Sequence, residues 1–187
     1  MFESEKVYKI KENLITGKMK NRVIIPFSEI KQIMKKSKDL CHEEKVNLFF
    51  FFILMKSECN INEIRRQMKI SKNKKDEYLL IVKDLSKEKK SKNNLYFSKK
   101  ELLYLLNKKV YKRCLYFIIT VKINLIFNNN FSISRKRLIQ HFFNYNINNK
   151  NSTRKAINWL NELVSHKIIG SYTKDKNKFY FYKNIKK

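Results

Sequence analysis

The end of the chain combines an amphipathic helix pattern with two short runs that are typical of β-strands. Between residues 153 and 166, apolar side chains recur every three or four positions and therefore share one helical face. They are Ala156, Leu160, Leu163 and Val164. Two runs rich in β-branched and aromatic residues follow at 168–173 and 179–182, and a polar segment with three lysines separates them. The pattern predicts one helix followed by a β-hairpin with a basic tip.

The same order of patterns occurs twice along the chain. The first copy has three helix patterns and a short strand, which are predicted at residues 43–56, 61–68, 74–86 and 94–98. The second copy has three helix patterns before the hairpin, at residues 110–127, 134–144 and 153–166. The copies share few identical residues, so the repeat lies in the order of the elements. This order predicts a structural duplication.

The length of 187 residues fits two modules of about 70 residues each, preceded by an N-terminal extension. No stretch rich in glycine, serine or proline separates the modules, which favours two lobes that pack together. The expected domains are a β/α extension at 1–40, a first module at 41–100 and a second module at 101–187. In the extension, a strand pair is predicted around Gly17 and includes the apolar run 23–25, and a helix is predicted at 29–36.

In the second copy, Leu160 and Leu163 are followed after a short turn by the apolar pair Ile168 and Ile169. This pattern resembles the winged helix-turn-helix superfamily, although Lys167 stands where the turn of that family usually has a glycine. The tandem arrangement over residues 43–183 resembles plasmid and phage replication initiators of the Gram-positive type. The resemblance implies an α+β, mainly helical fold with two tandem winged-helix modules, each a helix-turn-helix with a β-hairpin wing.

The chain is strongly basic, with 43 lysines and arginines against 16 acidic residues and a formal net charge of +27. Such a charge repels itself in a compact protein and is relieved by a polyanion, either nucleic acid or an anionic membrane surface. The abundance of Lys, Asn, Ile, Phe and Tyr, whose codons are AT-rich, explains part of the lysine content. It does not explain the scarcity of Asp and Glu, so the composition favours nucleic acid.

The polar face of the helix at 153–166 carries side chains that can read base edges. Arginine can form two hydrogen bonds to guanine, and asparagine can form two to adenine. The residues predicted to form this recognition helix surface are Ser152, Arg154, Lys155, Asn158 and Asn161. Asn151 or Ser152 is expected to cap the helix.

Basic residues elsewhere in the second module are expected to hold DNA phosphates. They cluster at the start of the helix at 134–144, which Ser134 is expected to cap, and at the hairpin tip. The predicted phosphate contacts of this module are Arg135, Lys136, Arg137, Lys174, Lys176 and Lys178.

The first module is a weaker candidate for reading DNA. Asp76 and Glu77 lie in the first turn of its third helix, which Asn73 is expected to cap, and carboxylates there oppose phosphate contact. Its basic wing is predicted at 87–93, and its predicted phosphate contacts are Arg65, Arg66, Lys72, Lys74 and Lys75. A packing or dimer role for part of this module stays open.

Catalysis, metal binding and cofactor binding are not supported by any motif. Gly17 and Gly170 are isolated, and neither precedes the Lys-Ser or Lys-Thr pair of a phosphate-binding loop. The residues that could ligate a metal or form disulfides are widely spaced: His42, His141, His166, Cys41, Cys59 and Cys114. No catalytic residue, metal site, cofactor or small-molecule ligand is therefore predicted.

Membrane insertion and secretion are not expected either. The longest apolar run, at 48–55, is far shorter than the roughly 20 residues that span a bilayer. The acidic start of the chain lacks the basic region of a secretory signal, and the scattered cysteines suit a reducing compartment. A cytoplasmic protein is expected.

Together these patterns favour a non-enzymatic protein that binds double-stranded DNA with sequence preference. The expected role is replication, partition or transfer of a mobile element, and a second copy of the chain is a candidate partner. Two alternatives stay open, namely a transcriptional repressor with the same fold and an RNA-binding protein or protein-interaction scaffold.

Overall fold

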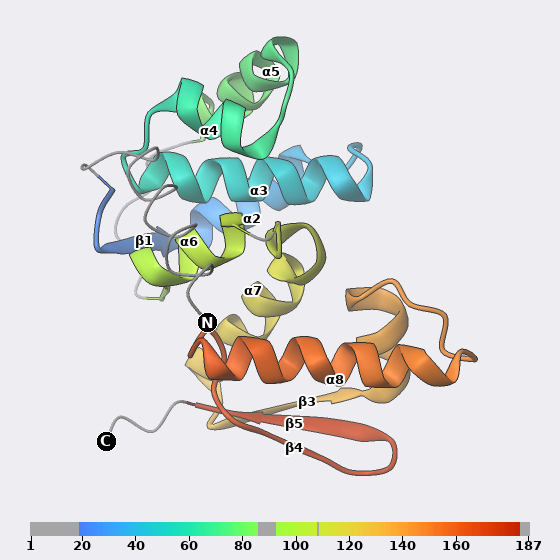
Figure 1. The fold of residues 1–187 in the computed structure, drawn as a ribbon. Coiled ribbons are helices and arrows are strands. Elements are labelled where there is room, and N and C mark those ends of the chain that lie inside the picture. Colours follow the sequence, from blue (N-terminus) through green and yellow to red (C-terminus); the bar gives the residue numbers. More distant parts are fainter. Residues whose placement is uncertain (1–18, 86–92, 108, 184–187) are drawn as a thin grey trace, which may run out of the picture. The chain divides into compact units, whose positions relative to one another are not determined.

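The computed structural model describes residues 19–85, 93–107 and 109–183 (Figure 1). The chain divides after Lys112 into two compact units, 1–112 and 113–187, which we call unit 1 and unit 2. In the described ranges, helices predominate and each unit holds a small antiparallel sheet. The α+β, mainly helical class that the sequence predicts is therefore confirmed. This division differs from the domain boundaries expected at 40 and 100, which stay a prediction.

The first described element of unit 1 is a strand that belongs to its sheet. Its elements are β1 (Arg22–Pro26), α2 (Phe27–Lys36), α3 (His42–Lys56), α4 (Ile61–Met68), α5 (Lys72–Lys83), β2 (Asn94–Ser98) and α6 (Lys99–Asn107). The apolar run 23–25 lies in β1, which pairs antiparallel with β2, with Val23 opposite Phe97. The expected partner strand around Gly17 lies outside the described residues. Because β1 and β2 share one sheet, this part of the expected extension is integral to unit 1.

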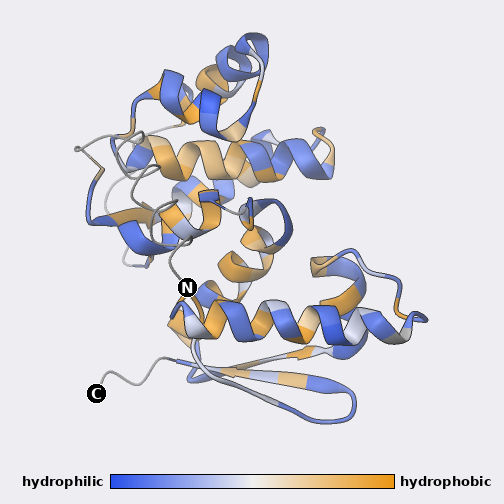
Figure 2. Ribbon diagram, in the orientation of Figure 1, coloured by the Kyte–Doolittle hydropathy of each residue, from blue (hydrophilic) through white to orange (hydrophobic). Residues whose placement is uncertain are grey.

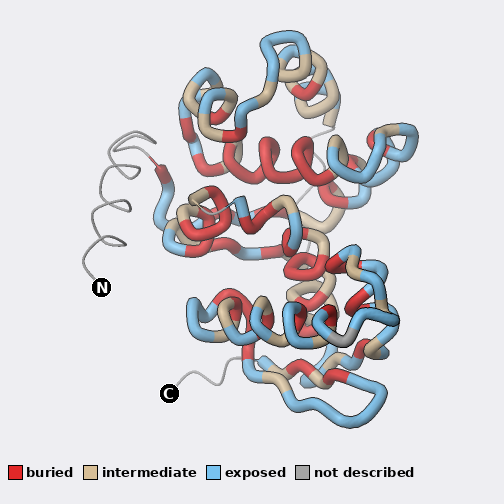
Figure 3. Tube along the Cα trace, turned by 45° about the vertical axis from the view of Figure 1, so that its right-hand side comes forward, coloured by how far each residue is buried: buried red, intermediate tan, exposed pale blue. Residues whose placement is uncertain are grey.

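The core of unit 1 is built around α3. Its run Phe49–Leu54 is buried on every side, as expected for a helix that is apolar all round (Figures 2 and 3). Phe50 stacks on Tyr111 with ring centroids 4.3 Å apart, and Phe51 meets the ring of Tyr78 at 5.7 Å. Helices α4 and α5 and strand β1 all contact α3. The central helix thus holds the other elements of this unit in place.

A three-residue turn joins α4 to α5. Asn60 caps α4 through its Oδ1, and the helix ends at Lys69, which adopts a left-handed conformation with φ of 57°. The side chain of Ser71 accepts a hydrogen bond from the Lys74 amide and caps α5. The predicted cap Asn73 is therefore wrong, because α5 begins at Lys72 and Asn73 already lies within it.

The described part of unit 2 contains three strands, one more than the sequence patterns predict. After α7 (Tyr111–Phe127), in whose first turn the unit begins, the elements are β3 (Asn130–Ser134), η1 (Arg137–Phe142), α8 (Lys150–Ser165), β4 (Tyr172–Lys174) and β5 (Lys178–Tyr182). The sheet order is β3-β5-β4, with both pairs antiparallel. The predicted hairpin is confirmed as β4 and β5. The missed strand β3 carries a short polar-apolar alternation in which Ile133 is buried.

Phe117 on α7 is the centre of the unit 2 core. Its ring centroid lies 5.7 Å from that of Phe142, 5.5 Å from that of Phe143 and 5.4 Å from that of Phe181. These rings come from η1, the residue after it, and β5, so one side chain on α7 contacts both the helical layer and the sheet. The predicted apolar face of α8 also closes this core, since Ala156, Leu160 and Leu163 are fully buried.

The helix predicted at 134–144 is present as a short π-helix, which has a wider turn than an α-helix. From Arg137 to Phe142 the chain winds as a π-helix, with the Phe143 amide donating to the Leu138 carbonyl at 3.2 Å. The predicted cap is present, because Ser134 Oγ accepts a hydrogen bond from the Arg137 amide. The segment ends at Asn144, which has a positive φ of 53°.

The turn after α8 forms without a glycine. The amide of Lys167 donates to the Val164 carbonyl and that of Ile168 to the Leu163 carbonyl, both at 2.9 Å, which is a Schellman motif. Lys167 takes the left-handed position with φ of 56°. Gly170 serves another purpose, because a Cβ there would lie 1.8 Å from the carbonyl oxygen of Tyr182. Its lack of a side chain lets the chain pass close to the end of β5.

We expect Phe117→Ala to lower the free energy of unfolding of unit 2 by about 3–5 kcal/mol, because it removes the ring that three others contact. Chemical denaturation followed by the fluorescence of Trp159, the single tryptophan, reports on this unit. Phe127→Ala on the same helix is the control, since Phe127 is 58% exposed and its loss should cost less than about 0.5 kcal/mol. Equal effects of the two substitutions would contradict the assignment of the core.

Lys167→Gly should stabilise unit 2 by about 0.5–1 kcal/mol, because glycine adopts the left-handed conformation without the Cβ clash that lysine suffers. The same denaturation experiment measures the change. Lys167→Ala is the control and should give no gain, since alanine retains the Cβ. A stabilisation by alanine equal to that by glycine would show that the backbone conformation is not the cause.

Candidate nucleic-acid interface

The two units differ in how their charges are balanced. Residues 113–187 include fifteen lysines and arginines but only two acidic residues, Glu162 and Asp175. Residues 1–112 include 28 basic and 14 acidic residues. Unit 2 therefore has few carboxylates with which to neutralise its cations, and a polyanion would relieve their mutual repulsion.

The predicted reading residues of α8 share one exposed face. Arg154, Lys155, Asn158 and Asn161 are all exposed, on the side of the helix away from its buried apolar residues. In Figure 2, polar and apolar residues alternate along α8 with this helical period. Ser152 is the exception, because it is only 5% exposed and shares the buried face with Ala156. The prediction of Ser152 as a contact residue is therefore wrong.

Asn149 caps α8, rather than the predicted Asn151 or Ser152. Its Oδ1 accepts a hydrogen bond from the Asn151 amide at 2.9 Å, and its carbonyl accepts one from the Ser152 amide at 2.9 Å. The sequence offers several neighbouring residues that could cap a helix, and the path of the preceding loop selects among them. The first turn of α8 consequently begins at Lys150.

Arg135 connects the start of α8 with the hairpin tip. Its Nη2 and Nε donate to Thr153 Oγ1 at 2.8 and 3.2 Å, and its backbone amide donates to the Asn177 carbonyl at 2.8 Å. A shallow surface depression at this junction is lined by Ser134, Arg135, Lys136, Ile147 and Asn177. Two predicted phosphate-binding residues, Arg135 and Lys136, thus lie together beside α8.

The other predicted cations of unit 2 also lie on its surface. Arg137 is exposed, with its guanidinium carbon 5.8 Å from the centroid of the Phe142 ring. Lys174, Lys176 and Lys178 are exposed at the tip of the β4–β5 hairpin, which a hydrogen bond from the Asp175 amide to the Lys178 carbonyl closes. The three lysines therefore lie within five residues of one another, at the tip of the β4–β5 hairpin whose backbone Figure 1 shows.

Tyr145 organises a cluster that the sequence reasoning missed. Its hydroxyl accepts a hydrogen bond from Trp159 Nε1 at 3.0 Å. The Arg113 guanidinium carbon and the Lys155 Nζ lie 5.5 and 5.9 Å from the Tyr145 ring centroid, within the range of cation–π attraction. The cluster ties α8 to the loop before it and adds Arg113 as a surface cation. No local pattern signals it, because its members are brought together only by folding.

The side chain of Asn161 is hydrogen-bonded to the sheet of unit 2. Its Oδ1 accepts a hydrogen bond from the hydroxyl of Tyr172 on β4 at 2.7 Å. Burial raises the pKa of the Tyr172 phenol above its ordinary value, so the phenol stays protonated and able to donate at neutral pH. The carboxamide of Asn161 is therefore anchored to the sheet.

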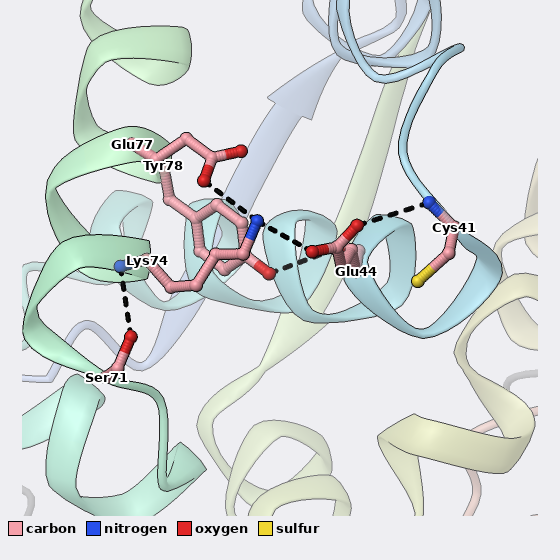
Figure 4. Close-up of polar contacts among 6 residues, drawn as sticks. All are labelled: Cys41, Glu44, Ser71, Lys74, Glu77 and Tyr78. Carbon is pink, nitrogen blue, oxygen red and sulfur yellow. Dashed lines mark hydrogen bonds and ion pairs between the residues drawn. The ribbon is translucent and has the colours of Figure 1, made fainter.

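In unit 1, Lys74 is neutralised by carboxylates of its own unit (Figure 4). Its Nζ lies 2.6 Å from Glu44 and 2.8 Å from Glu77. The pKa of Lys74 is raised, most by its hydrogen bond to Glu44 and next by its hydrogen bond to Glu77. The bond between Lys74 and Glu44 also lowers the pKa of Glu44. Since Glu44 lies on α3 and Lys74 on α5, this network joins two helices of unit 1.

Two of the remaining predicted contacts of unit 1 are paired with acidic side chains. Lys75 pairs with Asp76 at 3.0 Å, and Arg66 pairs with Glu63 at 3.4 Å. Arg65 is half-buried and Lys72 is exposed. Three of the five predicted cations, counting Lys74, are thus paired with acidic side chains. The predicted wing falls on residues 87–93, of which 87–92 lie outside the described residues.

Within residues 19–85, 93–107 and 109–183, no group of three or more His, Cys, Asp and Glu side chains is placed to hold a metal ion. In the same ranges, no helix has both the length and the apolar character that a bilayer crossing requires.

No protein-family model matches the chain, and neither a curated protein nor a solved structure is significantly similar to it. The charge, exposure and contacts of its own residues therefore carry the functional argument.

Asn149→Ala should destabilise unit 2 by about 1 kcal/mol, because the cap of α8 is lost. Asn151→Ala is the matched control and should be neutral or slightly stabilising, since Asn151 lies on the exposed side of the helix. Denaturation followed by Trp159 fluorescence compares the two variants. The reverse order of stabilities would mean that α8 is capped at Asn151 instead.

Proposed function

We propose that the chain is a non-enzymatic protein that binds double-stranded DNA and reads its sequence with α8. One observation carries this proposal: Arg154, Lys155 and Asn158 lie exposed on one face of α8, in a unit with fifteen basic and two acidic residues. A helix of this kind fits the major groove, where arginine and asparagine side chains distinguish base pairs.

The topology of unit 2 supports a winged-helix module. Its order is helix α7, strand β3, helical segment η1, helix α8 and then the hairpin of β4 and β5, and β3 pairs with the second hairpin strand. This is the order expected of a helix-turn-helix with one wing. In unit 1, the helices α3, α4 and α5 and the short turn before α5 resemble the same arrangement, although β1 joins its sheet from before α3. We propose tandem winged-helix modules on this basis.

In the proposed complex, two groups of cations have different tasks. The lysines of the hairpin tip, together with Arg135 just before η1 and Arg137 at its start, would hold phosphates on either side of the groove. Arg154 would pair with guanine and Asn158 with adenine, each through two hydrogen bonds. Phosphate contacts would supply most of the affinity and its salt dependence, while α8 would supply the preference for sequence.

Unit 1 would contribute less to DNA binding than unit 2. Its cations Lys74, Lys75 and Arg66 are paired with carboxylates, which compete with phosphate. We assign to it a role in packing or in contact with a second copy of the chain. The resemblance of the sequence pattern to replication initiators favours replication, partition or transfer of a mobile element as the biological setting.

Arg154→Ala and Asn158→Ala should each weaken binding to the preferred site by about 1–3 kcal/mol and relax base preference, because each removes a two-hydrogen-bond contact. Lys176→Ala should weaken binding to preferred and scrambled DNA alike, and should reduce the slope of log affinity against log salt by about one. Selection from a random duplex library, followed by fluorescence anisotropy titrations at about 150 mM salt and across a salt series, measures both effects.

Lys74→Ala is the control for charge alone, because it removes one positive charge that Glu44 and Glu77 already neutralise. It should leave DNA affinity almost unchanged. Failure of the library to yield a motif, or equal losses from Arg154→Ala and Lys176→Ala on preferred and scrambled DNA, would contradict reading through α8. Stronger competition by single-stranded RNA than by duplex DNA would instead favour an RNA-binding protein.

A further inference from the structure

We propose that Tyr172 sets which base the C-terminal half of α8 accepts, because it holds the Asn161 carboxamide with its amide N–H groups as the part offered to DNA. The inference rests on the DNA-binding function proposed above. It predicts that the base facing Asn161 presents acceptors with no donor of the same base beside them, as guanine does with O6 and N7 and thymine with O4, whereas adenine has the N6 donor beside its N7 acceptor.

The bond between Tyr172 and Asn161 joins the hairpin to the reading helix. Tyr172 lies on β4 and Asn161 on α8, and the hydroxyl oxygen is 2.7 Å from Asn161 Oδ1. The Tyr172 ring packs with its centroid 6.1 Å from those of Phe179 and Phe181, both of which are fully buried. The ring is therefore held by the core, and its hydroxyl forms a fixed anchor for the carboxamide.

A carboxamide anchored in this way loses its fit to adenine. Asparagine reads adenine by accepting from N6 with its oxygen and donating to N7 with its nitrogen, so both atoms must face the base edge. In Asn161, the oxygen is directed to Tyr172, and turning it toward a base would break that hydrogen bond. The nitrogen, with two N–H donors, is what remains for DNA.

Asn158 provides the contrast within the same helix. It is exposed and lies three residues before Asn161, so both project from neighbouring turns of one face. In the part of the chain that the structure describes, no hydrogen bond holds the Asn158 side chain, which leaves both its oxygen and its nitrogen for a base. The two asparagines are therefore expected to differ, with adenine opposite Asn158 and guanine or thymine opposite Asn161.

The test compares the motifs that the full-length chain and its variants select from a random duplex library. Asn161→Ala identifies the base position that depends on Asn161, and the unaltered chain should prefer guanine or thymine there. Tyr172→Phe keeps the packed ring but removes the hydroxyl, so adenine should gain on guanine or thymine at that position by roughly three- to tenfold. Salt dependence and binding to scrambled DNA should not change.

Tyr182→Phe is the matched control. It removes a hydroxyl from the same sheet. The Tyr182 hydroxyl lies 3.2 Å from Thr173 Oγ1 and does not bond to α8, so the selected motif should stay the same. Thermal melting establishes that both variants fold. Two outcomes would overturn the proposal while leaving DNA reading intact. One is that Tyr172→Phe selects the same base as the unaltered chain at the position facing Asn161. The other is that the unaltered chain already selects adenine there.

A second measurement on the free protein tests the anchor itself. The side-chain amide resonances of Asn161 should shift in NMR spectra of Tyr172→Phe and stay in place in Tyr182→Phe. If they do not shift, the anchor is absent and the inference fails regardless of DNA. If neither the unaltered chain nor any variant selects a motif, the proposed function fails, and the inference fails with it.

Discussion

The packing of α8 against the Phe117 cluster is the constraint on which the functional surface depends. Because Ala156, Leu160 and Leu163 must be buried there, the rotation of the helix about its axis is set. That rotation puts Arg154 and Asn158 on the outside and Ser152 on the inside. The surface that would read DNA is thus a consequence of the apolar face behind it.

Three polar contacts then position α8 within its unit. Arg135 bonds to Thr153 near the start of the helix, Trp159 bonds to Tyr145 in its middle, and Tyr172 bonds to Asn161 near its end. The partners come from the residue that follows β3, the loop before α8 and the hairpin. Because these hydrogen bonds hold α8 near its start, middle and end, its side chains stay at defined distances from the hairpin. Recognition of base edges needs that precision.

The two units use their charges differently. In unit 1, carboxylates on α3, α4 and α5 pair with lysines and arginines on α4 and α5. These cations are therefore neutralised within the unit. In unit 2, two acidic residues face fifteen basic ones. The net charge of +27 is therefore divided almost evenly, +14 in unit 1 and +13 in unit 2, but unit 1 has the acidic partners that unit 2 lacks. The total charge alone does not reveal this division.

Patterns local in the chain determined much of the fold. The helical period of Ala156, Leu160 and Leu163 and the paired apolar runs of the hairpin depend on neighbouring residues, so the sequence alone predicts α8, its exposed face and the β4–β5 hairpin. Other features were decided only by the tertiary structure. The partner of β1 lies some seventy residues away in β2, and the carboxylates of Lys74, the cluster on Tyr145 and the anchor on Asn161 also join separate elements. Such contacts leave no periodic signal, because the folded path of the chain, and not the spacing of residues, brings their members together.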